Sequence, residues 1–195
     1  MWPIVRPRLN ETRTFSVEYR VIPGQIQIIN ITPGWNAISV YLKPKDTSLL
    51  RYLEDQPYRS VFSPSGEGWT FNIRDSDTKN LSILEPGRGY LIDSSENFTI
   101  ELRGKPVDLP YRITLGKGWN LIGVPFNRTF SVNNITVNAE HKRYSYSDAV
   151  EKGLISAFLW SYDGIEWNYV AENDTLIPGN AYLLEASNDC RLEFR

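Results

Sequence analysis

Few side chains in this sequence could act as a nucleophile or bind a metal tightly. His141 is the only histidine and Cys190 the only cysteine. A Ser-His-Asp or Cys-His arrangement needs a histidine base, and a zinc site needs several histidine or cysteine ligands. His141 lies in the charged run 140–143, which is typical of a solvated loop, whereas Cys190 has the character of a small buried residue near the last strand. We therefore expect no catalytic residues, no metal and no cofactor.

The carboxylates do not single out a site either. The segment Asp75-Ser76-Asp77-Thr78-Lys79-Asn80 resembles the first half of a calcium loop, but it has neither the central glycine nor the distal glutamate of such loops. A simple polar turn is the better interpretation. The chain holds 23 Asp plus Glu, yet no two of them stand out as the acid and base of a glycosidase. The sequence thus favours a protein that is not an enzyme.

Attachment of glycans is the one modification with a clear sequence signal. Asn-x-Ser/Thr sequons are the acceptor sites of N-linked glycans. They occur at Asn10, Asn30, Asn80, Asn97, Asn127, Asn134 and Asn173. These seven sequons are more than chance would supply in a chain of this length, which predicts an N-glycosylated extracellular or cell-surface protein of an archaeon or a eukaryote. The alternative is a turn-rich β protein without glycans, because Asn and Thr are common at strand ends.

One hairpin has side chains that could stack on a ligand. Asp163-Gly164 is a strong two-residue hairpin turn, since both positions must accept a positive φ. The turn predicts three cross-strand pairs on one face: Tyr162 with Ile165, Trp160 with Trp167, and Phe158 with Tyr169. Such a face could hold a sugar, with Tyr162, Trp160 and Trp167 as the candidate stacking residues. Because the opposite face is polar, we expect instead that the rings belong to the core and that only Tyr162 at the tip is exposed.

The elements that must position these side chains are repeated in the sequence. The motif Gly118-Trp119-Asn120-Leu121-Ile122-Gly123-Val124-Pro125 has an earlier copy, Gly34-Trp35-Asn36-Ala37-Ile38-Ser39-Val40. Each copy is followed by a hairpin centred on a tryptophan, Trp69 or Trp167, and then by the pattern Leu-x-Pro-Gly-x-x-Tyr-Leu at 84–91 and 176–183. Three signals in the same order indicate an internal duplication.

The residue types of the motif suit structural roles. The glycine is expected to end a turn with a backbone geometry that glycine adopts freely. The tryptophan is expected to bury its ring, and the asparagine to bridge the turn through its side-chain amide. Tyr90 and Tyr182 follow a Pro-Gly turn and are expected to pack inward. We therefore interpret the motif as specifying the fold.

Alternating apolar and polar residues with frequent turn signals predict an all-β protein. We expect two related β-sandwich or β-barrel modules, in residues 33–108 and 109–195, preceded by an N-terminal arm and leading strands in residues 1–32. Within this leading region, 1–13 is the extended arm, while 15–21 and 25–31 are strands. These strands could pack on the protein's own body, which we favour, or add to the sheet edge of a neighbour.

One short helix is expected in each module. Asp46 or Thr47 can cap a helix that includes Leu49 to Leu53, and Ser145 or Ser147 can cap one that includes Ala149 to Leu154. The second module is also longer: 48 positions separate Trp119 from Trp167, against 34 between Trp35 and Trp69. The extra residues lie in 127–153. A loop-borne difference between related units is a place where function often lies.

Taken together, the three repeated signals resemble the Gly-Trp-Asn-Leu-Ile-(Ser/Gly)-Val-Pro repeat domain of secreted and cell-surface proteins of archaea and bacteria. The resemblance covers nearly all of residues 31–195, although Ala37 and Tyr41 stand where Leu and Pro are usual. It implies an extracellular location and a β-rich adhesive or envelope role. It supplies no catalytic residues.

Charge and hydropathy limit the partners. The formal net charge of −2 argues against nucleic acid, and no apolar run approaches the roughly 20 residues of a membrane span. We expect a non-enzymatic extracellular structural or adhesive protein of a cell envelope, sheath or filament, whose partners are copies of itself or other envelope proteins. The alternative is a secreted carbohydrate-binding module that uses the aromatic hairpin.

Overall fold

The computed structural model describes residues 24–77 and 79–195. The predicted arm 1–13, the predicted strand 15–21 and the sequon at Asn10 lie outside these residues. The described part is mostly β structure in antiparallel sheets, which confirms the all-β prediction. We call residues 24–106 the first half and residues 107–195 the second half.

The elements follow the chain in this order. The first half contains β1 (Gln25–Ile31), β2 (Gly34–Ser39), β3 (Leu42–Pro44), α1 (Leu49–Leu53), β4 (Tyr58–Gly66), β5 (Gly68–Ile73), β6 (Gly89–Ser94) and β7 (Phe98–Pro106). The second half contains β8 (Tyr111–Leu115), β9 (Gly118–Gly123), β10 (Phe130–Ser131), the 3-10 helix η1 (Val132–Asn134), β11 (Thr136–Ala139), β12 (Lys142–Ser145), α2 (Tyr146–Glu151), β13 (Leu159–Tyr162), β14 (Trp167–Val170), β15 (Thr175–Leu176), β16 (Ala181–Ala186) and β17 (Cys190–Phe194).

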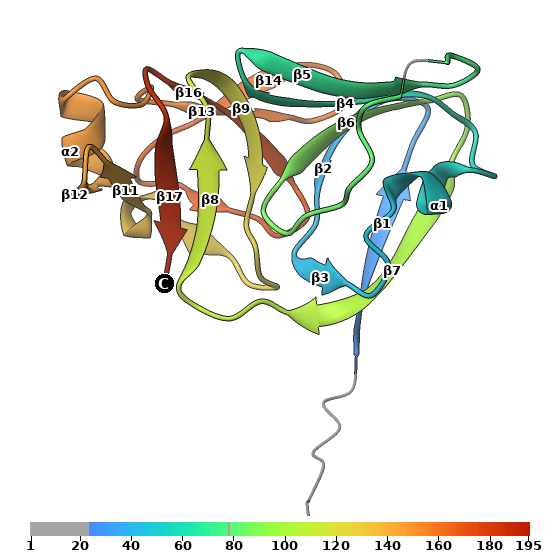
Figure 1. The fold of residues 1–195 in the computed structure, drawn as a ribbon, viewed down its shortest axis with the longest axis horizontal. Coiled ribbons are helices and arrows are strands. Elements are labelled where there is room, and N and C mark those ends of the chain that lie inside the picture. The colour runs from blue at the N-terminus through green and yellow to red at the C-terminus, as the bar shows by residue number, and fades with distance from the viewer. Residues whose placement is uncertain (1–23, 78) are drawn as a thin grey trace, which may run out of the picture.

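One large sheet runs through both halves, and a smaller sheet belongs to each half. The large sheet has the order β14-β13-β16-β9-β4-β6-β2, with β5 added to β4. The first half adds a three-stranded sheet, β1-β7-β3, and the second half adds a four-stranded sheet, β12-β11-β17-β8; β10 and β15 form a separate pair. Figure 1 shows the two smaller sheets at opposite sides of the molecule, with α1 beside the first and α2 beside the second.

The repeated sequence signals form repeated structure. Strand β2 pairs with β6, and β9 pairs with β16, in the same register: Trp35 lies opposite Asp93 as Trp119 lies opposite Glu185. The Tyr90 hydroxyl accepts the N–H of Glu85 at 2.9 Å, and the Tyr182 hydroxyl accepts the N–H of Ile177 at 2.7 Å. We call residues in the same position of the two halves counterparts.

Each half has its own hydrophobic core between its smaller sheet and its part of the large sheet. In the first half, buried Ile31 and Leu102 pack with Val61 and Ile92. In the second half, the core is built from the buried side chains of Leu115, Ile122, Val137, Tyr182, Leu192 and Phe194, among others. Strand β1 pairs with β7 of the same chain, so residues 25–31 pack on the protein's own body, as expected.

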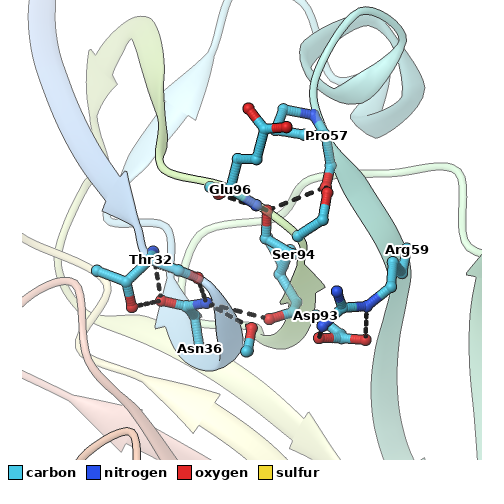
Figure 2. Close-up of polar contacts among 10 residues, drawn as sticks. Thr32, Asn36, Pro57, Arg59, Asp93, Ser94 and Glu96 are labelled. Atoms are coloured by element: carbon cyan, nitrogen blue, oxygen red, sulfur yellow. Dashed lines mark hydrogen bonds and ion pairs between the residues drawn. The ribbon is translucent and has the colours of Figure 1, made fainter.

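The turn before each tryptophan motif is held as predicted. Gly34 has φ of 90° and Gly118 has φ of 101°. In the first half, the Asn36 amide spans the turn: its Oδ1 accepts the N–H of Thr32 at 3.0 Å and its Nδ2 donates to the Thr32 carbonyl at 2.8 Å (Figure 2). Asn120 makes the same two bonds to Gly116, at 3.0 and 2.8 Å. The asparagine therefore specifies the turn in both halves.

The end of β6, at Asp93 and Ser94, contacts the start of β4 through polar side chains. The Ser94 hydroxyl donates to the Pro57 carbonyl at 3.0 Å, and the Arg59 guanidinium forms a two-pronged ion pair with the Asp93 carboxylate (Figure 2). These contacts join neighbouring strands near the Asn36 turn, which fixes the register of this edge of the large sheet.

Two details of the local prediction are wrong. The tryptophans of the motif are not buried: Trp35 is 41% and Trp119 is 38% exposed. The reason is strand alternation, because Ile38 and Ile122 face the core and the tryptophan three positions earlier must point to the opposite side. The residue at the N-cap of α1 is Ser48, not Asp46 or Thr47; the Asp46 carboxylate accepts the Ser48 N–H.

The second helix begins where it was predicted to begin. The Ser145 hydroxyl accepts the N–H of Asp148 at 3.0 Å, which caps α2. The predicted burial of Cys190 is also confirmed, and this burial raises the pKa of its thiol to about 11. Burial of the Cys190 side chain thus favours the protonated thiol over the thiolate.

The large sheet folds back so that its two halves meet reciprocally. The Ser39 N–H donates to the Gly179 carbonyl at 2.7 Å, and its counterpart, the Gly123 N–H, donates to the Gly87 carbonyl at 2.8 Å. A side chain at Gly123 would overlap the Ser39 hydroxyl, since the added Cβ would lie 2.1 Å from its Oγ. The two halves thus pack like the subunits of a twofold dimer within one chain.

Candidate functional site: an aromatic hollow and a polar seam

The hairpin β13–β14 differs in register from the prediction. Tyr162 lies opposite Trp167 and Trp160 lies opposite Tyr169, so the loop has four residues, 163–166, instead of two. The Asp163 carboxylate accepts the N–H groups of Ile165 and Glu166 at 2.8 and 2.9 Å, which stabilises the longer loop and lowers the pKa of this carboxyl. The register moved by two residues. The rings therefore stay on one face, as predicted.

That aromatic face does not point into the hydrophobic core, which corrects the second part of the prediction. Leu159, on the other face of β13, is fully buried, and its cross-strand partner Val170 packs against the same core. Trp167 is 37% exposed and Tyr169 is 67% exposed. The sequence argument took the more polar face as the solvent face. In the fold, this hairpin lies at the end of the large sheet, where only one apolar pair reaches the core.

The exposed rings of the two halves gather around one hollow. Four side chains of the first half and two of the second enclose a volume of about 360 Å³; they are Trp35, Phe62, Trp69, Leu91, Tyr162 and Trp167. The ring centroids of Trp35 and Phe62 are 5.9 Å apart, and those of Tyr162 and Trp167 are 5.2 Å apart. We call this the aromatic hollow.

Sequence reasoning found only part of this site. Of the three candidate stacking residues, Tyr162 and Trp167 line the hollow, whereas Trp160 lies on the same face of β13 without lining it. Trp35 and Trp69 were missed, although Trp69 is 52% exposed. A signal was present: Trp35 and Ile38 are separated by an odd number of positions, so in one strand they point to opposite faces.

A polar depression of about 420 Å³ adjoins the aromatic hollow and shares Trp35 and Tyr162 with it. Its polar lining residues are Gln27, Asn30, Thr32, Asn36, Asn127, Asp163 and Asn180. Gln27 is buried and held firmly, since its Nε2 donates to the Ser39 carbonyl at 2.8 Å and its Oε1 accepts the Tyr41 N–H at 2.9 Å. We call this depression the polar seam, because it lies between β2 and the tip of the β13–β14 hairpin.

The combined site places apolar rings beside polar amides. Flat rings on paired strands present apolar faces at fixed positions, and the amides of the seam present both donors and acceptors. Asp163 is the one carboxylate among the residues that line the hollow or the seam. Its oxygens already accept three hydrogen bonds, two from the loop and one from the Asn168 amide on β14. The site therefore has the parts to hold a polar molecule that also has an apolar face.

The remaining predicted residues lie apart from this site. His141 is exposed, with φ of 62°, in the tight turn between β11 and β12. In residues 24–77 and 79–195, no cluster of three His, Cys, Asp or Glu side chains is arranged to hold a metal ion. None of the helices in this part of the chain has the length and apolar character needed to cross a membrane.

All six sequon asparagines of the described residues are exposed. They are Asn30, Asn80, Asn97, Asn127, Asn134 and Asn173. By contrast, Asn72 and Asn120, which stand outside sequons, are buried. Asn30 and Asn127 lie at the polar seam, so a glycan on either would stand beside the candidate site.

Comparisons of the chain with protein families, with curated proteins and with solved structures found no match.

Proposed function

We propose that this chain is a non-enzymatic extracellular adhesive protein that binds neutral carbohydrate in the aromatic hollow and the polar seam. The observation that carries the proposal is the hollow itself, where exposed rings from both halves converge. An exposed aromatic cluster of this kind marks a binding surface, because soluble proteins otherwise bury such rings.

A sugar fits the site better than other ligands do. One face of a pyranose ring carries C–H groups that stack on tryptophan, while its hydroxyl groups need amide and carbonyl partners at the rim. Trp35 and Trp167 supply the first requirement, and the exposed amides of Asn127 and Asn180 in the seam supply the second. A purely apolar ligand would cover the exposed amides of Asn127 and Asn180 without giving them partners, which is costly.

The repeated frame supports an adhesive role of the kind that the resemblance implies. We infer that the two halves arose by duplication and form two β-sandwiches that share the large sheet. Identical registers and reciprocal contacts between the halves support this inference. A rigid frame of this type suits a protein that holds a ligand without changing it.

The matched pair Trp35→Ala and Trp119→Ala tests the binding site. The two tryptophans are counterparts with similar exposure, but only Trp35 lines the hollow. With cello-, malto-, manno- and chito-oligosaccharides as probes in calorimetry, we expect Trp35→Ala to weaken binding about tenfold, the effect of about 1.4 kcal/mol of lost stacking. Trp119→Ala should bind as the wild type does. Equal losses in both variants, or no binding of any probe at millimolar concentration, would contradict the proposal.

An extracellular location rests on the exposed sequons. The intact mass of the protein from its native source, measured before and after deglycosylation, tests it against the chain mass of 22.4 kDa. A mass at the bare chain value would leave the sequons as turn residues.

Self-association is a second candidate role. Among the described residues, strand β1 is at the edge of its sheet, and its Ile26 and Ile28 are exposed. An open strand edge with apolar side chains is a surface on which another sheet can add. Light scattering of the wild type and of Ile28→Lys tests this role; if both are monomeric at high concentration, it is wrong.

A further inference from the structure

The outer face of the four-stranded sheet in the second half is rich in arginine. Strand alternation sends Val137, Leu115 and Leu192 into the core and every second residue outward. The outward set, with the residue after β17 included, is Arg112, Thr114, Thr136, Asn138, Arg143, Ser145, Arg191, Glu193 and Arg195. Four guanidinium groups and one carboxylate leave an excess of three positive charges, on a chain whose net charge is −2. We call these nine residues the cationic face.

Three of the arginines are held in place by the buried carboxylate of Glu193. Arg112 Nε lies 2.7 Å from Oε2, Arg195 Nε lies 2.6 Å from Oε1, and Arg143 also pairs with Oε1. Burial opposes ionisation of this carboxyl, but the three guanidinium groups outweigh it and keep its pKa below the ordinary value. One carboxylate neutralises only one of the three cations. The arginines remain about half exposed, so they present fixed donors outward.

The fourth arginine has no ion pair within the part of the chain that the structure describes. Arg191, Asn138 and Arg143 lie side by side on the neighbouring strands β17, β11 and β12. Arg191 and Arg143 are two strands apart, so their backbones are about 10 Å apart. The Asn138 Nδ2 between them is buried without an acceptor among the described residues. This row lines a depression of about 680 Å³, whose rim also carries the charged side chains Glu140, Lys142 and Asp189.

The fold does not require this charge, as the first half demonstrates. The counterpart of the Glu193–Arg195 pair is Glu101–Arg103, joined at 2.7 Å. The counterpart of Arg112 is Ile28, and the counterpart of Arg191 is Thr99. Arg143 lies on β12, a fourth strand that the three-stranded sheet of the first half does not have. The two similar faces therefore differ in charge, and the arginines beyond the Glu193–Arg195 pair are found only in the second half.

We propose that the cationic face binds an acidic polysaccharide through carboxylate or sulfate groups spaced along its chain. Fixed guanidinium groups about 10 Å apart suit oxyanions carried by a chain of linked sugars. The cationic face carries neither aromatic nor aliphatic side chains, so it offers nothing on which nucleobases would stack and nothing that would enter a bilayer. This binding is separate from that of neutral sugar in the aromatic hollow and uses other residues.

Dextran sulfate and neutral dextran of equal length are the matched probes, and Arg191→Gln and Arg103→Gln are the matched variants. Both arginines are exposed, and Arg191 has no partner in the described residues to lose, so folding should be unaffected. We expect the full chain to bind dextran sulfate, with affinity that falls as salt rises, and not to bind neutral dextran. Arg191→Gln should weaken binding at least threefold and lower the salt slope by about one, whereas Arg103→Gln should match the wild type.

The outcomes separate this proposal from its alternatives. Equal binding of neutral dextran, or equal losses in the two arginine variants, would overturn it. Tighter binding to phosphatidylserine vesicles or to single-stranded DNA than to dextran sulfate would also overturn it, in favour of a membrane or a nucleic acid. Trp35→Ala should retain dextran sulfate binding, so the aromatic hollow and the cationic face can fail independently.

Discussion

The hairpin β4–β5 of the first half meets β9 of the second half, and the hairpin β13–β14 of the second half lies beside β2 of the first half. The two junctions are built from counterparts, yet strands pair across only one of them. Where β4 meets β9, Ser65 lies opposite Asn120 and Gly66 lies opposite Trp119, and the Gly66 N–H donates to Asn120 Oδ1 at 3.0 Å. In the described residues, β2 ends the large sheet without pairing to β13. The open junction is the polar seam.

The difference arises in the hairpin loops. Strands β4 and β5 pair as far as Ser65 and Gly68, which leaves a short tip that reaches β9. Strands β13 and β14 stop pairing at Tyr162 and Trp167, because the Asp163 carboxylate stabilises a four-residue loop. One change of turn chemistry thus keeps a junction open beside exposed rings. The comparison teaches that one hairpin loop decides whether a junction between the halves is closed or open.

The largest predicted effect is a difference in the free energy of unfolding between alanine variants of the two loop glycines, Gly66 and its counterpart Gly164. Gly66 has φ of 68°, and an added Cβ would lie 2.8 Å from backbone atoms of Gly116 and Lys117. We expect Gly66→Ala to lower the free energy of unfolding by about 3 kcal/mol, through strain and overlap at the closed junction. Gly164 has φ of 102° with no atom within 4 Å of an added Cβ, so Gly164→Ala should cost only about 1 kcal/mol. Urea denaturation measures both; equal costs would show that the junctions do not differ as described.

A smaller difference in the free energy of unfolding is expected between alanine variants of the two turn asparagines, Asn120 and Asn36. Asn120 Oδ1 accepts N–H groups from both Gly116 and Gly66 and is buried, so Asn120→Ala should cost about 2 kcal/mol by leaving donors without acceptors. Asn36 holds its own turn without a bond across the seam, and Asn36→Ala should cost about 1 kcal/mol. The same denaturation measurement applies. An Asn36→Ala variant that is less stable than Asn120→Ala would contradict this order.

The smallest effect is a change in the pH dependence of stability when Glu193, whose carboxylate holds three arginines, is replaced. The pKa of Glu193 is lowered in the folded protein, so its stabilising contribution is complete above the unfolded pKa of about 4.3. That contribution is lost as the pH falls through the lower folded pKa. We therefore expect the free energy of unfolding of Glu193→Gln to vary less with pH below about 4.3 than that of the wild type. Urea denaturation at a series of acid pH values measures this, and a Glu193→Gln variant that keeps the wild-type curve would contradict it.

Much of the local frame could be predicted from the sequence. The glycine and asparagine of each motif act within four residues of the chain, and Ser145 caps a helix that starts beside it. Such contacts join residues that are close in sequence, so the local sequence predicts them. The sequence did not show on which side of the sheet, core or solvent, the tryptophan rings would lie. Alternation states that Trp35 and Ile38 face opposite sides, but it does not state which side a second sheet covers.

The sequence by itself determined the all-β class, the order of the repeated motifs and the turns that Gly34, Asn36, Gly118 and Asn120 form. Their geometry depends on short-range sterics and hydrogen bonds, which any chain with these residues would obey. Only the tertiary structure decided that rings distant in sequence share one hollow, that one junction is closed and the other open, and that four arginines surround Glu193 or lie beside it. These features depend on strands brought together across 50 residues or more, and no local pattern carries that information.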